Sequence, residues 1–362
     1  MPSGTAQRTA SQGGTPRRAL PILGSGGGSG VHPVTAPPPR SVRLSVTDRC
    51  DFACTYCRPS RSDGYVRERL DVKAWRVLVE GLVRAGVRRI RLTGGEPLIH
   101  PDVVRIIETI VLAAEAAGVS RDELDLALTT NASQLARLAV PLAASGLRRV
   151  NVSIDTLDSE RFRAITRGGE LEPVLEGIEA ALRAGLRPLK LNTVVLRGVN
   201  DDELEPLVHF AWERGLVPRF LEVMPIAEGA KLARSQLVTV AEMRARLAPL
   251  LEDGAAEPEP DRGPARYIAA RGRPDRRVGF ISGTSDTYCS SCDRLRVSST
   301  GTLRPCLATD VGVEAAPALR VESAEAVAAL VNDAWALKPD GRTFKGCTED
   351  SAARVSMRAI GG

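Results

Sequence analysis

The sequence lacks any run of about 18 uninterrupted apolar residues, the length that a membrane-spanning helix requires. Its most apolar stretch, residues 106–119, is interrupted by Glu108 and Glu115. A secretory signal is also lacking, because only five apolar residues follow the basic pair at 17–18 before a run of glycine and serine. We therefore expect a cytoplasmic protein with no membrane partner.

Excess charge is nearly absent from most of the chain. The 49 Lys+Arg and 44 Asp+Glu residues leave a net charge of +5, and residues 1–40, with four arginines and no acidic residue, contribute +4 of it. A protein that binds long stretches of nucleic acid usually presents a clustered basic face. We therefore expect no nucleic-acid partner, while a local anion pocket stays compatible with the sequence.

Residues 1–40 lack the apolar side chains that a folded core needs. Gly, Pro, Ser and Thr make up 23 of these 40 residues, so the segment is predicted to be disordered. A second loop-rich break, at residues 252–277, separates a barrel at 41–250 from a smaller C-terminal domain at 251–362.

Strand-like and helix-like segments alternate between these breaks. The strand-like segments are 42–46, 90–92, 124–129, 150–154, 189–196 and 217–223. The helix-like segments between them are 72–85, 102–117, 134–144, 174–184 and 202–214, and another follows at 324–336. Repeated βα units predict an α/β fold with a parallel sheet, here a partial (βα)6 TIM-like barrel. Its chemistry is expected at the carboxyl ends of the strands.

Seven cysteines form two groups of three with one left over, Cys347. An odd number in a reducing compartment argues against a disulfide framework and favours metal binding or redox chemistry.

The first group is Cys50-x3-Cys54-x2-Cys57, with Tyr56 before the last cysteine. Three thiolates on one loop can bind three irons of a cubane cluster and leave the fourth iron open. Zinc is the alternative, but its sites more often combine paired ligands from two places, and no histidine lies nearby.

The second group is Cys289-x2-Cys292-x13-Cys306, again with three ligands. It predicts either another cluster with an open iron or a zinc site completed by Cys347.

Several cations stand at positions where an anionic ligand would suit them. Arg294 and Arg296 alternate on one predicted strand, and two parallel guanidinium groups suit a polyphosphate. Arg91 and Lys190 alternate with apolar neighbours and should point into the barrel, where a buried cation calls for an anion. The alternative for Arg294 and Arg296 is a solvated charged strand, and the alternative for Arg91 and Lys190 is a strand end that reaches solvent.

The Cys-x3-Cys-x2-Cys motif resembles the signature of the radical S-adenosylmethionine (SAM) family. In that family the open iron binds SAM, and reduction cleaves SAM to methionine and a 5′-deoxyadenosyl radical. The two cysteine groups, the Arg-x-Arg pair and the terminal Gly361-Gly362 together resemble the GTP 3′,8-cyclases of molybdenum cofactor biosynthesis. This resemblance covers residues 41–362 and includes segments 44–50, 93–97 and 151–155.

The resemblance implies two [4Fe-4S] clusters, SAM and the substrate GTP. The SAM cluster would bind Cys50, Cys54 and Cys57, and an auxiliary cluster facing guanine across the barrel would bind Cys289, Cys292 and Cys306. The implied SAM-binding residues are Tyr56, Gly95, Ser153 and Met224. The implied GTP-binding residues are Arg43, Arg91, Thr129, Lys190, Arg294, Leu295 and Arg296. The implied catalytic residues are Arg43, Arg294, Arg296 and the tail glycines Gly361 and Gly362, which would reach the active site. Gly94 and Gly95 are expected to be glycine because a ligand approaches the backbone there, the alternative being a plain strand-to-helix turn.

The implied reaction removes the ribose C3′ hydrogen of GTP and joins C3′ to guanine C8. The implied partners are GTP, an electron donor and the downstream cyclic pyranopterin monophosphate synthase, and a homodimer is allowed. Two positions depart from the family pattern: Ala132 stands where glycine is usual, and Arg58 where an apolar residue is usual. Cys347 has no family role and is expected to be a small buried hydrophobe. The alternatives are a peptide maturase or another two-cluster radical SAM enzyme, and a non-catalytic iron–sulfur or zinc redox or scaffold protein.

Overall fold

The computed structural model describes residues 39–58, 65–66, 68–258, 263–289, 292–339 and 357. Residues 1–38 of the segment predicted to be disordered, Cys347 and the Gly361-Gly362 tail lie outside these residues. The chain divides into the units Met1–Gly30 and Val31–Gly362, and the fold described below belongs to the second. Among the described residues, no helix is both long enough and apolar enough to span a membrane.

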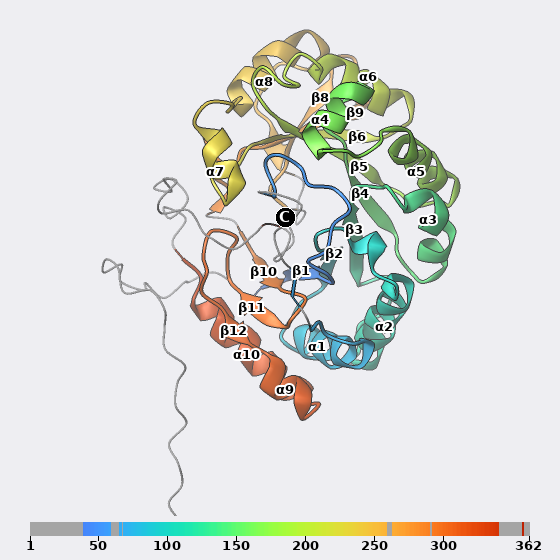
Figure 1. Cartoon of the computed structure of the whole chain (residues 1–362), viewed down its shortest axis with the longest axis vertical. Helices are drawn as coiled ribbons and strands as arrows, with labels where there is room; N and C mark the ends of the chain where they lie inside the picture. The colour runs from blue at the N-terminus through green and yellow to red at the C-terminus, as the bar shows by residue number, and fades with distance from the viewer. Residues whose placement is uncertain are drawn as a thin grey trace, which may run out of the picture. The chain divides into compact units, whose positions relative to one another are not determined.

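Six parallel strands lie side by side in chain order. They are β1 (Ser41–Ser45), β2 (Arg89–Thr93), β3 (Asp125–Thr130), β4 (Arg149–Ser153), β5 (Leu189–Val195) and β6 (Val217–Glu222). The connecting helices are α1 (Val72–Arg84), α2 (Val103–Ala116), α3 (Leu135–Ala144), α4 (Ser159–Thr166), α5 (Glu172–Arg183) and α6 (Leu204–Glu213), with the 3-10 turn η1 (Pro97–Ile99) before α2. Figure 1 shows helices along the outer side of the curved sheet. The predicted partial (βα)6 barrel is confirmed.

The segment after residue 250 does not form a sheet of its own but extends the barrel sheet at both edges. Beyond β6 come β9 (Arg273–Ile281), β8 (Arg266–Ala270) and β7 (Glu257–Pro258), where β9 runs parallel to β6. Beyond β1 come β10 (Arg294–Val297), β11 (Thr302–Arg304) and β12 (Val313–Glu314), where β10 runs parallel to β1. The cations predicted on residues 294–296 therefore lie directly beside the first strand.

Short helices complete this part of the chain. Between β6 and β7 lie α7 (Glu228–Ala233), α8 (Val240–Leu247) and η2 (Ala248–Leu250), and after β12 lie α9 (Ala316–Arg320) and α10 (Ala324–Ala336). Helix α10 packs on α1, as Figure 1 shows. The fit is close, because a Cβ added at Gly81 of α1 would lie 2.5 Å from the side chain of Val327 on α10.

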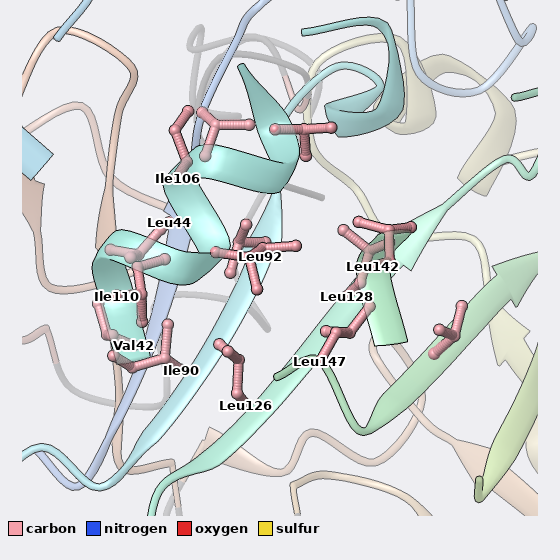
Figure 2. Close-up of a cluster of buried hydrophobic side chains, with 14 of the residues drawn as sticks. Val42, Leu44, Ile90, Leu92, Ile106, Ile110, Leu126, Leu128, Leu142 and Leu147 are labelled. Atoms are coloured by element: carbon pink, nitrogen blue, oxygen red, sulfur yellow. The ribbon is translucent and has the colours of Figure 1, made fainter. Parts of the chain in front are cut away.

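The core lies between the strands and the outer helices. Figure 2 shows Ile106 and Ile110 of α2 near Val42, Leu44 and Ile90, and all five side chains are buried. Burying one such side chain contributes about 2 kcal/mol. Because side chains alternate along a strand, apolar residues that face the helices leave the intervening residues facing the interior of the barrel.

Candidate active site

The inward faces of the strands enclose a cavity lined by many charged side chains. Most of the lining residues alternate along each strand, which follows from the two-residue period of a strand, and Ile90, Thr130 and Glu222 are exceptions. The lining strand residues include Ser41, Arg43, Arg89, Arg91, Thr93, Asp125, Ala127, Thr129, Arg149, Asn151, Ser153, Lys190, Asn192, Val194, Arg219, Leu221, Ile281, Arg294 and Arg296. In the register of the sheet, Arg43 stands between Arg91 on β2 and Arg296 on β10.

The loop that carries the first cysteine group is held by α4, a helix that the sequence does not predict. The backbone N–H of Ala53 donates to the carbonyl of Thr166 at 3.1 Å, and that of Thr55 donates to the carbonyl of Ile165 at 3.0 Å. The Phe52 ring meets the Phe162 ring edge-on, with centroids 5.8 Å apart. The cavity is lined by Cys50, Cys54 and Cys57. Helix α4 therefore fixes the position of the loop from which these thiols enter the cavity.

The Gly-Gly-Glu turn after β2 clamps the backbone just before Cys50. The N–H of Gly95 donates to the carbonyl of Thr47, and the N–H of Glu96 donates to that of Arg49, both at 2.7 Å. A Cβ at Gly95 would lie 2.2 Å from the Arg49 oxygen, and one at Gly94 would lie 2.5 Å from the Thr47 oxygen. The close approach at these glycines is thus made by the chain's own backbone, a reason that differs from the expected approach of a ligand.

The first cysteine group is buried and lies near two carboxyl groups. Burial raises the pKa of Cys50 and of Cys54, and the nearby carboxyl groups of Glu96 and Asp155 raise the pKa values of Cys50 and Cys54 respectively. Without metal these thiols stay protonated, whereas bound iron would supply the positive charge that stabilises the thiolates. No three His, Cys, Asp or Glu side chains converge on a single-ion site in the described part of the chain. A [4Fe-4S] cluster does not need that convergence, since each thiolate binds a different iron. The three thiols therefore fit such a cluster.

Two buried carboxyl groups tie the strand ends around this loop. Glu96 accepts hydrogen bonds from the Thr130 hydroxyl at 2.7 Å and the Asn131 N–H at 2.6 Å, and burial raises its pKa to about 8. Asp155 accepts from the Tyr56 hydroxyl at 2.7 Å, and burial raises its pKa to about 6. Asp51, beside Cys50, accepts from the Asn131 side chain at 2.8 Å. The network joins the ends of β2, β3 and β4 to the cysteine loop.

Both departures from the family pattern border this network. Ala132 is fully buried and adopts a left-handed conformation, with φ of 64°, which explains why glycine suits the position. Arg58 is buried, and its guanidinium lies 5.0 Å from the centre of the Tyr65 ring. The carbonyl of Arg58 accepts from the Arg167 side chain at 2.8 Å.

The remainder of the cavity is strongly cationic. Its lining contains eight Lys and Arg side chains against four Asp and Glu side chains. Two of the arginines are paired at the amino ends of the strands, Arg89 with Asp293 and Arg149 with Asp125. The other six are Arg43, Arg91, Lys190, Arg219, Arg294 and Arg296.

Mutual repulsion among these cations is visible in their pKa values. Burial and then Arg296, Arg294 and Arg91 lower the pKa of Arg43. Burial, followed by Arg219, lowers the pKa of Arg91 to about 9, and burial, followed by Arg294, lowers that of Arg296 to about 10. A polyanion bound among them would relieve both the desolvation and the repulsion.

The sequence patterns did not predict Asn151, Asn192 and Arg219, which also line the cavity. The Arg219 guanidinium donates to the Asn151 side-chain oxygen at 2.7 Å. The side-chain oxygen of Asn192 is buried and has no hydrogen-bond partner among the residues that the structure describes. A signal was present, since Asn151 and Asn192 stand two positions from Ser153 and Lys190 and therefore share their faces. Arg219 lies within a strand that reads as apolar.

The second cysteine group lies beside the cavity, next to residues that line it. Its three cysteines are not among the described lining residues, but Tyr288 and Arg294 are, and the Arg294 guanidinium lies 4.6 Å from the centre of the Tyr288 ring. Burial alone would raise the pKa of Cys292, but Arg294 and Lys338 outweigh it and lower this pKa to about 6. A thiol that ionises this readily is a ready ligand for iron. Cys289 and Cys306 pack near Met224, a further lining residue.

The structure thus gathers most of the predicted site residues in one cavity. Those that line it are Cys50, Cys54, Cys57, Tyr56, Gly95, Ser153, Met224, Arg43, Arg91, Thr129, Lys190, Arg294 and Arg296. Leu295 is different, because its side chain is fully buried in the core on the opposite face of β10. Gly361 and Gly362 lie outside the described residues.

Solved structures share the fold of this chain. SuiB of Streptococcus suis bound to its precursor peptide SuiA aligns with a TM-score of 0.55 at 15% identity, covering 85% of this chain and 66% of that one. SuiB bound to S-adenosylmethionine aligns with a TM-score of 0.54 at 16% identity, covering 78% and 65%. The chain therefore spans about two thirds of the length of SuiB, and this likeness concerns the fold alone.

Sequence comparison is more specific. The Radical SAM superfamily model matches residues 44–211, and the Molybdenum Cofactor Synthesis C model matches residues 217–344. The GTP 3′,8-cyclase of Paracoccus denitrificans is 41% identical over 320 residues, which are 87% of this chain and 90% of that protein. GTP 3′,8-cyclase 1 of Pseudomonas aeruginosa is 43% identical over 282 residues, covering 77% and 83%. These matches assign the chain to molybdenum cofactor biosynthesis. Membership of the Radical SAM superfamily implies a [4Fe-4S] cluster and SAM as cofactors. The chain belongs to the GTP 3′,8-cyclase family of radical SAM enzymes.

Proposed function

We propose that this protein cyclises GTP to (8S)-3′,8-cyclo-7,8-dihydroguanosine 5′-triphosphate, the first step of molybdenum cofactor biosynthesis. One observation carries the proposal: a three-cysteine loop and six cationic side chains open into the same cavity. The loop suits a SAM-binding cluster, and the cations suit a triphosphate. A cavity that holds both brings a radical source and a nucleotide together.

The cysteine loop and the strand ends would hold the cluster and SAM. Cys50, Cys54 and Cys57 would bind three irons, and the lining positions of Tyr56, Gly95, Ser153 and Met224 support their predicted role around SAM. When bound, the reduced cluster and SAM supply the radical chemistry that removes the C3′ hydrogen of GTP and releases methionine and 5′-deoxyadenosine. The buried Tyr56–Asp155 hydrogen bond keeps the loop at the end of β4 during that step.

The cations would bind the triphosphate. GTP carries about four negative charges, and Arg43, Arg91, Lys190, Arg294 and Arg296 present five positive ones, with Thr129 as a hydroxyl donor. Charge interactions strengthen inside a cavity of low dielectric constant, so these groups both bind GTP and fix its ribose relative to the cysteine loop. Tyr267 orients the Lys190 side chain, because the Lys190 ammonium donates a hydrogen bond to the Tyr267 hydroxyl at 3.1 Å.

The second cysteine group would hold an auxiliary [4Fe-4S] cluster with an open iron toward the guanine base. Addition of the C3′ radical to C8 leaves an unpaired electron on the base, and one electron from the electron donor and one proton complete an isomer of GTP. Arg294 and Arg296 would stabilise the charge that develops in this reduction. The Gly361-Gly362 tail is proposed to reach the same place.

The test is an anaerobic incubation of iron-reconstituted protein with SAM, dithionite and GTP deuterated at C3′. We expect deuterium in 5′-deoxyadenosine and a product with the mass expected for a GTP isomer. Arg296→Gln should reduce both, whereas Arg121→Gln, which alters an exposed ion pair, should not. Deuterium-free 5′-deoxyadenosine from active protein would refute abstraction from C3′, and absence of the isomer would refute cyclisation.

A further inference from the structure

Lys338, to which the proposed function gives no role, lies against the second cysteine group. Lys338 follows α10, two residues after its last helical residue. Its ammonium lies 3.6 Å from the Cys292 sulfur, 3.2 Å from the carbonyl oxygen of Arg294 and 3.0 Å from that of Pro305. An ammonium has three N–H donors, and these three acceptors match that number.

The three acceptors come from two separate chain segments. Cys292 and Arg294 belong to the segment that enters β10, and Pro305 directly precedes Cys306 in the segment that leaves β11. Lys338 therefore bridges the two segments that supply Cys292 and Cys306. A change in either segment would move one of these two sulfurs relative to the other.

The lysine itself is held firmly. Its ammonium lies 4.3 Å from the centre of the Trp335 ring, a buried residue of α10, which adds a cation–π contact. Helix α10 in turn packs on α1 through the close contact between Gly81 and Val327. The ammonium is thus held from the outer layer of the barrel as well as by the two cysteine segments.

We propose that Lys338 is a positioning residue for the second cluster, which joins the segments of Cys292 and Cys306 and gives the Cys292 sulfur an N–H···S hydrogen bond that raises the cluster's reduction potential. The proposal rests on the proposed function, because it requires that the second cysteine group hold a cluster. Hydrogen bonds to cluster sulfurs and nearby positive charge both favour the reduced, more negative cluster. The redox step is the one-electron change from [4Fe-4S]2+ to [4Fe-4S]+, with dithionite as the reductant.

The experiment isolates the second cluster. In the full chain, Cys50, Cys54 and Cys57 are replaced by alanine, the protein is reconstituted anaerobically, and iron, sulfide and the potentiometric EPR signal are measured. The same parent receives Lys338→Met, Lys338→Arg or, as a control for loss of one lysine charge, Lys73→Met, which removes an exposed ion pair with Glu322. At a fixed solution potential we expect the ratio of reduced to oxidised cluster to fall about tenfold in Lys338→Met, or ~59 mV for one electron. Lys338→Arg should restore most of it, and Lys73→Met should leave it unchanged.

The outcomes separate this inference from the proposed function. A parent that binds no iron and sulfide would overturn the second cluster and with it this inference. A full cluster with an unchanged potential in Lys338→Met would overturn the role of Lys338 alone. If Lys338→Met assembles no cluster, two further measurements distinguish a positioning role from a general structural one. They are the melting temperature of its metal-free form and cluster assembly in Lys338→Arg. Assembly restored by arginine in an otherwise stable protein supports positioning, and a metal-free protein that is itself unfolded refutes it in favour of a general structural role.

Discussion

Replacing Gly95 by alanine separates two reasons for a glycine beside Cys50. If the glycine serves only a ligand, the metal-free protein should tolerate a methyl group there. In the structure, however, that methyl would lie 2.2 Å from the Arg49 oxygen. The contact must open by roughly 1 Å, because ordinary packing keeps such atoms well above 3 Å apart.

The cost can be worked out from the contacts at the turn. Overpacking of this kind costs about 1–3 kcal/mol. Displacement of the Arg49 carbonyl weakens the 2.7 Å hydrogen bond that it accepts from Glu96, and a shift of Gly95 itself weakens its 2.7 Å bond to the Thr47 carbonyl, each worth about 1 kcal/mol. We therefore expect Gly95→Ala to destabilise the metal-free protein by about 2–5 kcal/mol.

The assay is urea unfolding of metal-free protein followed by circular dichroism. Gly118→Ala is the matched control, because Gly118 has a φ of +85° and no atom within 4 Å of an added Cβ. It should show only the cost of a left-handed alanine, about 1 kcal/mol. An unfolding midpoint of Gly95→Ala equal to that of wild type, together with loss of SAM binding, would refute the backbone explanation.

Four further predictions concern the same region. Ala132→Gly should change the free energy of unfolding by less than about 1 kcal/mol, because relief of the left-handed strain is offset by the lost methyl burial and the greater freedom of the unfolded chain. Ala132→Val should lower the free energy of unfolding by several kcal/mol. Equal unfolding midpoints for the two variants would contradict this. The raised pKa of Asp155, about 6 against an ordinary 3.8, means that its protonated form favours folding, so this stabilisation is present below pH 3.8 and is lost as the pH rises through 6. Asp155→Asn should therefore match wild type at low pH and be more stable by about 3 kcal/mol at pH 7 in metal-free protein, and a pH-independent difference would count against the assignment. Arg219→Met should weaken GTP binding at least about tenfold by calorimetry, since one charge-assisted hydrogen bond is worth about 1.5–3 kcal/mol, while the surface variant Arg148→Met should bind like wild type. Cys54→Ala and Cys292→Ala should each lower iron content to about half, and a variant that keeps full iron content would remove its cysteine from the ligand set.

The sequence predicted the parts of the fold and site that follow from local periodicity. Strands with a two-residue period placed Arg91 and Lys190 on inward faces, and the structure puts both in the cavity. The cysteine spacing required no knowledge of the fold. Helix α4 was missed because it has only eight residues, of which Phe162, Ile165 and Thr166 are buried, too short for a clear helical pattern.

Contacts between distant segments could not be predicted in this way. The hydrogen bond between Tyr56 and Asp155 joins residues 99 positions apart, and no local pattern encodes it. The pairing of β10 with β1 is a similar case, because a strand's sequence specifies its faces but not its neighbour. Lys338 lies 46 positions from Cys292, two residues beyond the end of α10, and no local pattern links the two.

The pairing of β10 with β1 has a consequence for synthesis of the protein. The first strand is made early, but its outer neighbour follows about 250 residues later. At ribosomal rates of about 5–20 residues per second, that edge stays unpaired for roughly 10–50 s. During this interval the nascent chain exposes an open strand edge, the kind of surface on which β-rich chains associate wrongly.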